Sequence, residues 1–433
     1  YIQHHIFTPL HMDHSTFVQP LPKSLAADMS KGYALDTQDP KPYELIPMSP
    51  AGALATTGDD VARFMLAHLN NGTYDGAQIL KPETAATMHG ISYPVPAHTE
   101  PMGLGFYHED LNGHDVVSHG GDTIYFHSDL FLVLDKGVGL YYSQNSAGKP
   151  DQGIRWPLYV AFMDRYFPAP KAAKLPTLKT AKTDGALVAG SYIASRRSDS
   201  NMLRLTSLFG LVKVTLNSDG TISSDTEKDL AGQPKKFREI APFRWQDIHG
   251  TQQFIATRKD GKVDRIYTSD LPPILTLTPV PAWQGAWNLP LFIAMFAMLA
   301  LTVIFWPIKA LLRWRYETPF PLEGRQAQLY RLARVAALLD VVFLAGLIGV
   351  LQYGNDHLEV FSDGYDWLFR ILQAVGALGV VGTIAMVWNF LAGLGNTDRP
   401  WWTKITDLLI AVSGVAFIWF VITLKLITWS LNY

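Results

Sequence analysis

Hydrophobic residues form short periodic segments as far as position 281 and four long apolar runs after it. The runs cover residues 287–306, 335–353, 371–394 and 408–428 and contain very few charged side chains. An α-helix rises 1.5 Å per residue, so about 20 apolar residues cross the ~30 Å hydrocarbon core of a bilayer. The C-terminal part is therefore predicted to be an all-α region of four transmembrane helices in contact with the lipid bilayer.

Charge in the predicted loops indicates how these helices are oriented. The loop after the first run is rich in Lys and Arg, whereas residues 354–369 contain four acidic residues and no Lys or Arg. Arg399 and Lys404, between the third and fourth runs, repeat the basic pattern. Since cytoplasmic loops carry an excess of Lys and Arg, we expect a multi-pass protein of the inner (cytoplasmic) membrane. The part of the chain before Trp287 is then expected on the periplasmic or extracellular side.

One acidic residue, Asp340, lies well inside a predicted span. Charges inside a membrane often mark an ion or proton pathway, but Arg334 is close by in the sequence. Pairing with Arg334, or snorkelling to the interface, is therefore the preferred interpretation. Gly376, Gly379 and Thr383 place small residues on one helical face, which predicts close packing against another helix.

Helical and strand signals alternate over positions 1–168. Thr57 followed by Asp60 matches a capping box, and apolar residues then recur at helical spacing, which predicts a helix over 59–70. Residues 104–108, 115–118, 128–134 and 138–143 read as strands, and 155–166 reads as a closing helix. An α+β domain is expected over residues 1–168.

A second domain is predicted after a linker at 169–184, which contains Pro and Lys residues. Short apolar stretches such as Leu203 to Leu205 and Val212 to Leu216 alternate with turn signals at 217–220 and 259–262. This pattern predicts a small antiparallel β domain over 185–281.

Composition excludes several kinds of chemistry. The chain has no cysteine, so disulfides, thiolate metal sites and a catalytic cysteine are ruled out. The 36 basic and 38 acidic residues give a net charge of −2, so nucleic acid is not an expected partner. His11 and His14, with His4 and His5 close by, have a spacing that metal sites use. Pro9 argues against a continuous helix there, and we expect neither a metal nor another cofactor.

Four segments within positions 1–167 resemble the C-terminal portion of the β-lactamase-related, penicillin-recognising serine hydrolases. This family includes class C β-lactamases and low-molecular-weight penicillin-binding proteins. The segments are residues 1–12, 49–60, 102–106, and 118–123 with the hairpin ending at 142–146. The resemblance implies a partial β-lactamase/transpeptidase-like fold. His11 departs from it, because the family usually has Gly at that turn.

The resemblance also implies roles for His119, Gly120, Gly121 and Asp122. On a strand facing a nucleophile, a hydrogen-bonding side chain such as His119 meets the substrate carboxylate or developing oxyanion. Gly120 and Gly121 would leave room for the substrate backbone. The backbone N–H of Asp122 would form half of an oxyanion hole, and the N–H of the serine nucleophile would form the other half.

The family's nucleophile motif, Ser-x-x-Lys, and its Tyr-x-Asn motif normally precede the segment at residues 1–12. Residues 146–149 match Ser-x-x-Lys and residues 143–145 match Ser-x-Asn, but both follow His119 and lie almost on top of each other in the sequence. We therefore reject them as catalytic motifs. The chain is expected to be a fragment that is inactive alone, derived from a serine hydrolase that acts on D-amino-acid peptides, esters or β-lactams.

Two other classes of function remain open. The first is a non-catalytic membrane protein whose hydrolase-like ectodomain binds cell-wall peptide or a partner. The second is a small-molecule permease in which the ectodomain has no chemical role. The partners expected for the serine hydrolase are a small-molecule or peptide substrate and the lipid bilayer, and the oligomeric state stays open.

Overall fold

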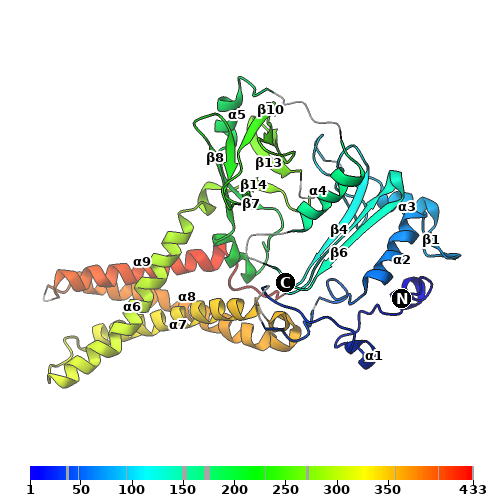
Figure 1. Cartoon of the computed structure of the whole chain (residues 1–433). Helices are drawn as coiled ribbons and strands as arrows, with labels where there is room; N and C mark the ends of the chain where they lie inside the picture. The colour runs from blue at the N-terminus through cyan, green and yellow to red at the C-terminus, as the bar shows by residue number, and fades with distance from the viewer. Residues whose placement is uncertain are drawn as a thin grey trace. The chain divides into compact units, whose positions relative to one another are not determined.

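The computed structural model describes residues 1–431 except 36–38, 47, 94, 149–153, 170–175, 230, 270–272, 356 and 398. Contacts between its residues divide the chain into two compact units. Figure 1 shows the chain coloured by residue number. One unit contains Tyr1–Arg196 and Val212–Pro279. The other contains Arg197–Leu211 and the residues from Val280 onward.

The N-terminal domain is built on a four-stranded antiparallel sheet in the order β3-β4-β5-β6 (Figure 1). Its strands are β3 (Tyr107–His108), β4 (Val116–Asp122), β5 (His127–Val133) and β6 (Val138–Gln144). The smaller elements of this domain are η1 (Gln3–Phe7), α1 (Lys23–Ala26), β1 (Thr73–Tyr74), β2 (Ala77–Gln78), α3 (Pro82–His89) and η2 (Leu134–Lys136).

Each face of the sheet is covered by one helix. Side chains alternate between faces along a strand, and Val116, Phe131 and Val133 pack with α4 (Arg155–Tyr166). Their neighbours one position along, such as Val117, face α2 (Gly58–Leu69) instead. The predicted α+β fold of the domain is confirmed as three layers, helix on sheet on helix.

Helix α2 begins where the sequence predicted, because the Thr57 Oγ1 atom accepts a hydrogen bond from the Asp60 backbone N–H at 3.3 Å. The carboxylate of Asp60 has other partners. It accepts hydrogen bonds from the His14 backbone N–H and the Ser15 hydroxyl, at 2.9 and 2.8 Å, and pairs with Arg63 at 2.7 Å. Asp60 thereby ties the N-terminal segment to α2.

Two residues of this domain, Gly105 and His11, have a left-handed backbone conformation. The strand expected over 104–108 is shorter, because Gly105 adopts a left-handed conformation, with φ of +77°, that interrupts an extended chain. His11 also has a left-handed backbone, with φ of +52°. His11 thus adopts a conformation that glycine favours, at the position where the resemblance expects glycine. Helix α4 spans the predicted residues 155–166.

The predicted antiparallel β domain is a closed barrel with the strand order β10-β11-β12-β13-β14-β7-β8-β9. Its buried centre includes Phe237, Trp245 and Phe254. Helix α5 (Ala181–Val188) precedes it and begins inside the predicted linker, of which residues 170–175 lie outside the described chain. The strands are β7 (Gly190–Ala194), β8 (Leu211–Leu216), β9 (Ile222–Ser224), β10 (Phe237–Ala241), β11 (Arg244–Asp247), β12 (Gln253–Lys259), β13 (Lys262–Thr268) and β14 (Leu277–Pro279).

The strand predicted around Leu203 to Leu205 is wrong. Residues Met202–Leu208 form a 3-10 helix, η3, whose first turn is capped by the side chain of Asn201. Met202, Leu205 and Leu208 are three positions apart, so they share one face of a 3-10 helix. That face is buried in a hydrophobic cluster with residues of the C-terminal helices. The contacts accordingly group Arg197–Leu211 with those helices, although the sequence suggested one continuous β domain over 185–281.

Four C-terminal helices are long and apolar enough to cross a membrane. They are α6 (Asn288–Arg315), α7 (Gly324–Gly354), α8 (Asp366–Leu394) and α9 (Trp401–Thr423), preceded or separated by the short helices η4 (Ala282–Gln284), η5 (Leu358–Phe361) and η6 (Asp363–Tyr365). Helix α6 begins one residue after the start of its predicted run, 287–306, and extends well past the end of that run. Helices α7 and α8 contain their predicted runs, 335–353 and 371–394, and both begin several residues earlier. The fourth is displaced toward the N-terminus and ends at Thr423, short of the predicted 428.

The preferred interpretation of Asp340 is wrong. Arg334 donates to Asp407 at 2.9 Å, and Arg399 also pairs with Asp407. Asp340 is fully buried, and neither of its carboxylate oxygens has a hydrogen-bond partner in the described part of the chain. The predicted close packing is present, since a Cβ atom built on Gly379 would lie 2.0 Å from Oδ1 of Asp340.

Candidate active site

The four residues selected from the sequence lie together at one end of β4. The neighbouring strand β3 pairs with Val117 and Ser118 and extends no further along β4. From His119 to Asp122, no strand among the described residues pairs with that side of β4. His119 and Asp122 are exposed, so this part of the strand is an open edge.

The backbone N–H of Asp122 is directed to this open edge. At the end of the β4–β5 ladder, the Thr123 N–H donates to the carbonyl of Phe126 at 2.9 Å. Hydrogen-bonded and non-hydrogen-bonded pairs alternate along an antiparallel ladder. Asp122, opposite His127, is therefore in a non-hydrogen-bonded pair, and its N–H points away from β5. The same alternation turns the N–H of Gly120 toward the open edge.

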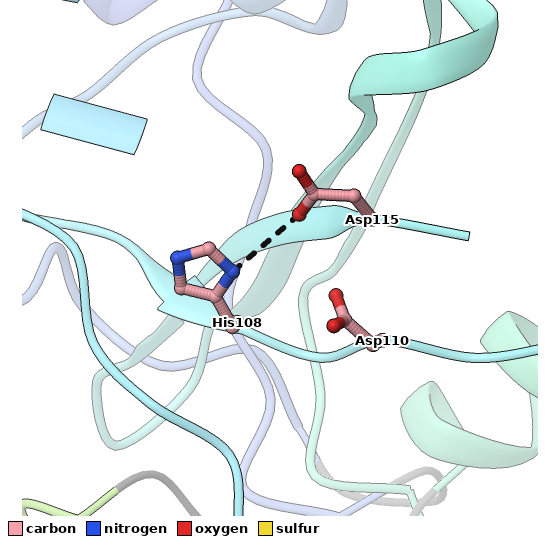
Figure 2. A group of neighbouring side chains, drawn as sticks. All are labelled: His108, Asp110 and Asp115. Atoms are coloured by element: carbon pink, nitrogen blue, oxygen red, sulfur yellow. Dashed lines mark ion pairs between the residues drawn. The ribbon is translucent and has the colours of Figure 1, made fainter. Parts of the chain in front are cut away.

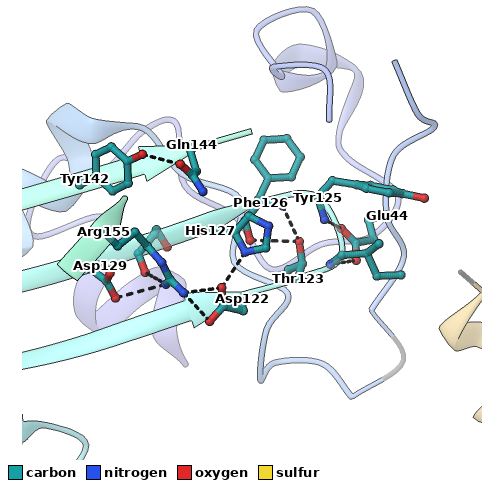
Figure 3. A network of polar contacts seen from close by, with 12 residues as sticks. Glu44, Asp122, Thr123, Tyr125, Phe126, His127, Asp129, Tyr142, Gln144 and Arg155 are labelled. Carbon is teal, nitrogen blue, oxygen red and sulfur yellow. Dashed lines mark hydrogen bonds and ion pairs between the residues drawn. The ribbon is translucent and has the colours of Figure 1, made fainter. Parts of the chain in front are cut away.

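Two side chains hold the carboxylate of Asp122 (Figure 3). Arg155, at the start of α4, donates to both carboxylate oxygens, at 2.8 and 3.0 Å. The Nδ1 atom of His127 lies 2.6 Å from Oδ1 of Asp122. Arg155 also donates to the carbonyl of Ser128 at 3.2 Å. The end of β4 is thus fixed to β5 and α4 through one guanidinium.

Gly120 is required by packing inside the domain. A Cβ atom at this position would lie 2.6 Å from Oδ1 of Asp129, which faces Gly120 across the ladder. Burial raises the pKa of Asp129 to about 6, against the opposing effect of Arg155, which lies 3.4 Å away. From the sequence, Gly120 was expected only to leave room for the substrate backbone. The structure adds a second reason for glycine, which is the close approach of the Asp129 carboxylate.

Glu44, which was not predicted as a site residue, fixes the turn after β4. The carboxylate of Glu44 accepts hydrogen bonds from the backbone N–H groups of Ile124 and Tyr125, at 2.6 and 3.3 Å (Figure 3). Thr123 adds a bond from the Phe126 N–H to its hydroxyl oxygen at 3.0 Å. No local pattern links Glu44 to a turn so much later in the chain.

The imidazole of His119 stacks on the ring of Tyr107, with centroids 4.9 Å apart and an angle of 18° between the planes. His119 is exposed, and none of the described residues hydrogen-bonds to its ring. Burial raises the pKa of the Tyr107 hydroxyl. A stacked ring with free nitrogens is held in place while it can still donate a hydrogen bond to a ligand.

The Ser-x-x-Lys match at residues 146–149 does not have the geometry of a nucleophile motif. The hydroxyl oxygen of Ser146 accepts a hydrogen bond from the backbone N–H of Gly148 at 3.0 Å, in a turn after β6. Lys149 lies outside the described residues. The Asn145 side chain donates to the Ser30 hydroxyl and the Lys31 carbonyl, at 3.1 and 2.8 Å. Neither match stands at the start of a helix.

The structure does not bring His4, His5, His11 and His14 into a three-ligand group within its described ranges. A different group does form, from His108, Asp110 and Asp115. This group was not predicted, although Asn112-Gly113 between these residues is a strong signal for a two-residue hairpin turn. Such a turn places Asp110 opposite Asp115.

Comparison with known proteins gives a family match over the N-terminal domain. A protein-family model described as Beta-lactamase matches residues 1–162. No curated protein sequence matches the chain.

Several solved structures show limited similarity. The octameric penicillin-binding protein homologue from Pyrococcus abyssi is 18% identical over 64% of this chain and 59% of its own, with a TM-score of 0.33. The protein SurE is 14% identical over 64% of this chain and 62% of its own, with a TM-score of 0.41. A class C beta-lactamase is 14% identical over 40% and 51%, with a TM-score of 0.32.

The chain spans less than two thirds of each of these structures. At such TM-scores, assignment to a family rests on the family model, which matches the same residues that form the three-layer domain. Residues 1–162 of this chain therefore match the beta-lactamase family model, and the rest of the chain lies outside that match.

Proposed function

We propose that the open edge of β4 is one wall of a serine-hydrolase site that transfers or hydrolyses an acyl group. In this reaction a serine Oγ attacks an amide, ester or β-lactam carbonyl and the C–N or C–O bond breaks. The amine or alcohol leaves, or in a β-lactam stays attached as the ring opens, and water then cleaves the acyl-enzyme ester. The Asp122 N–H would donate one hydrogen bond to the oxyanion of the tetrahedral intermediate. His119 would donate to the same oxyanion or to a substrate carboxylate.

The observation that carries this proposal is the direction of the Asp122 N–H. A preorganised backbone donor aimed at developing charge is the main electrostatic device of acyl transfer. Here the donor points to an edge that no described strand covers, on the same strand as the exposed imidazole of His119. Arg155 and His127 fix its residue through the side chain.

We further infer that this chain does not form an acyl-enzyme by itself. Ser146 follows the end of β6, where its hydroxyl accepts the Gly148 N–H, and it does not stand at the start of a described helix. The serine nucleophile and its proton carriers have to face β4 from another part of the protein. Small molecules or peptides with an acyl group remain the proposed substrates.

The proposed location is the inner membrane, with the N-terminal domain outside the cytoplasm. The basic residues between α6 and α7 support this orientation through the positive-inside rule. A reporter enzyme that folds only in the periplasm, fused after Pro281, should be active. An inactive fusion, together with an active cytoplasmic reporter at the same site, would reverse the orientation.

Active-site labelling tests the chemistry. The product of the complete open reading frame, in detergent, is treated with a fluorescent penicillin and with a fluorophosphonate, and mass spectrometry identifies the labelled residue. We expect one labelled serine and weaker labelling of His119→Ala. His114→Ala, a change of the same type before the start of β4, should be labelled like the wild type. A complete protein that takes up neither probe would favour a non-catalytic binding module.

A further inference from the structure

A second cluster of chemically active side chains lies at the opposite end of β4 from Asp122. His108, Asp110 and Asp115 bring one potential ligand atom each to within 4.8 Å of one another (Figure 2). The extended chain from Asp115 to Asp122 spans roughly 23 Å. The chain from Asp115 to His119 spans roughly 13 Å, so the cluster shares no residue with the proposed acyl-transfer site and lies beyond direct contact with it.

The hairpin that joins β3 to β4 explains the arrangement. Asn112 and Gly113 have φ values of +58° and +84°, the left-handed pair that a tight two-residue turn requires. Leu111 pairs with His114 across this turn, and farther along His108 pairs with Val117. In this register Asp110 stands directly opposite Asp115. His108, two positions before Asp110, is on the same face of the hairpin.

Two carboxylates directly opposite each other on a hairpin repel. Neither Asp110 nor Asp115 forms an ion pair with a Lys or Arg of the described chain. His114 and Lys136 both pair with Asp135 instead. Asp110 is also held in position, because its Oδ1 accepts the Val116 N–H at 3.0 Å.

Neutral histidines lie near this cluster and do not compensate its charge. His68 and His89 are joined by ring nitrogens 3.1 Å apart. Burial lowers the pKa of His68 to about 4 and also lowers the pKa of His89. Neither ring supplies a positive charge near neutral pH.

His108 is the third and most informative member. The residue is 6% exposed, and its Nδ1 points at the carboxylates, 3.5 Å from Oδ1 of Asp115 (Figure 2). That separation is too long for a good N–H···O hydrogen bond. The Nε2 atom is buried and has no partner within the described residues. Because Nδ1 makes no good hydrogen bond to Asp115, its lone pair is available to a ligand placed between the ring and the carboxylates.

The spacing suits a shared cation. Ligand bonds of about 2.0–2.1 Å in a tetrahedral site put neighbouring ligand atoms roughly 3.3 Å apart. The observed 3.5 Å between His108 Nδ1 and Asp115 Oδ1 is close to this value. The Asp110 carboxylate brings one oxygen to within 4.8 Å of both atoms.

We propose that His108 Nδ1 and one oxygen each of Asp110 and Asp115 bind a divalent first-row transition metal ion, with Zn²⁺ as the best match. One imidazole and two carboxylates suit Zn²⁺, whereas Mg²⁺ prefers oxygen ligands alone. Water would fill the remaining position. The ion would join β3 to β4 and neutralise the facing carboxylates, so its effect is on the stability of the sheet that carries His119.

Metal titration of the full chain in detergent tests this site. We expect one saturable Zn²⁺ equivalent by isothermal titration calorimetry, and an absorption band from nitrogen and oxygen ligands when Co²⁺ replaces Zn²⁺. Asp115→Asn should weaken Zn²⁺ binding at least about 10-fold, and Asp110→Asn/Asp115→Asn should abolish that equivalent and the Co²⁺ band. Asp135→Asn removes a neighbouring charge but no ligand, and should bind Zn²⁺ like the wild type. Mg²⁺ should not compete.

Two results would overturn the proposal. One is the absence of saturable Zn²⁺ binding to the wild type. The other is undiminished Zn²⁺ binding to the Asp110/Asp115 double variant. If His89→Ala then lost this binding, the Zn²⁺ site would be assigned to the His68–His89 pair instead. Far-UV circular dichroism of each variant shows whether it is folded. Saturating Zn²⁺ should also raise the temperature of unfolding of the wild type but not of the double variant.

Discussion

Arg155 donates two hydrogen bonds to the carboxylate of Asp122, at 2.8 and 3.0 Å, and so connects the first turn of α4 to the last residue of β4. The same residue, Asp122, directs its backbone N–H to the open edge of the sheet. An ion pair made by the side chain therefore positions a hydrogen-bond donor of the backbone. Arg155 acts in this account as a positioning residue.

Removing this ion pair should weaken the domain moderately. Asp122 is about half exposed, so Arg155→Gln should lower the free energy of unfolding by roughly 1 kcal/mol, the upper range for a bidentate pair near the surface. Arg165→Gln, an exposed position on the same helix, should change it by less than about 0.5 kcal/mol. Chemical denaturation of both variants measures the difference. Equal losses would contradict a specific contribution from the Arg155–Asp122 pair.

The buried carboxyl of Asp129 predicts a pH dependence of stability. Its pKa is raised to about 6 in the folded protein by burial, whereas an unfolded chain has an Asp pKa near about 3.9. Between these values the folded state holds a proton that the unfolded state has lost, so stability falls as pH rises from about 4 to 6. The loss from this group is at most about 3 kcal/mol.

The variant Asp129→Asn tests this assignment. Asparagine has no carboxyl group to titrate at this position. The free energy of unfolding of the variant should therefore fall less than that of the wild type between pH 4 and 7. Chemical denaturation at several pH values gives both profiles. Parallel profiles for the two proteins would show that Asp129 does not carry the effect.

Close packing between α7 and α8 predicts a selective effect of added methyl groups. Gly379→Ala places Cβ 2.0 Å from Oδ1 of Asp340, so we expect a loss of about 1–3 kcal/mol from overpacking. Gly349→Ala, in the interior of α7, meets no atom within 4 Å and should be tolerated. Thermal unfolding in detergent micelles compares the two. Similar melting temperatures would argue against the tight contact at Gly379.

Features set by neighbouring residues could be predicted from the sequence. The side chain of Thr57 caps α2, and apolar positions at helical spacing then determine which face is buried. The strands at 128–134 and 138–143 were expected on either side of Asp135-Lys136-Gly137, and Gly137 adopts the left-handed conformation that the turn needs. Both predictions depend on interactions between near neighbours in the sequence.

Features that depend on distant residues could not be predicted in this way. The three-residue spacing of Met202, Leu205 and Leu208 suits a 3-10 helix only because other helices bury that face. Arg334 has Asp407, 73 positions later, as its partner, and this leaves Asp340 unpaired among the described residues. At the candidate site, the sequence located His119 to Asp122, but the supports from Glu44 and Arg155 arise from the tertiary fold.

The central claim is that the His119–Asp122 edge takes part in acyl transfer. Its most direct test is the rate at which the complete protein forms a covalent adduct with a fluorophosphonate, compared among wild type, His119→Ala and His114→Ala. Loss of one transition-state hydrogen bond predicts a decrease of about 10²-fold or more for His119→Ala, with His114→Ala unchanged. Equal rates for all three proteins, or a wild type that forms no adduct, would contradict the claim.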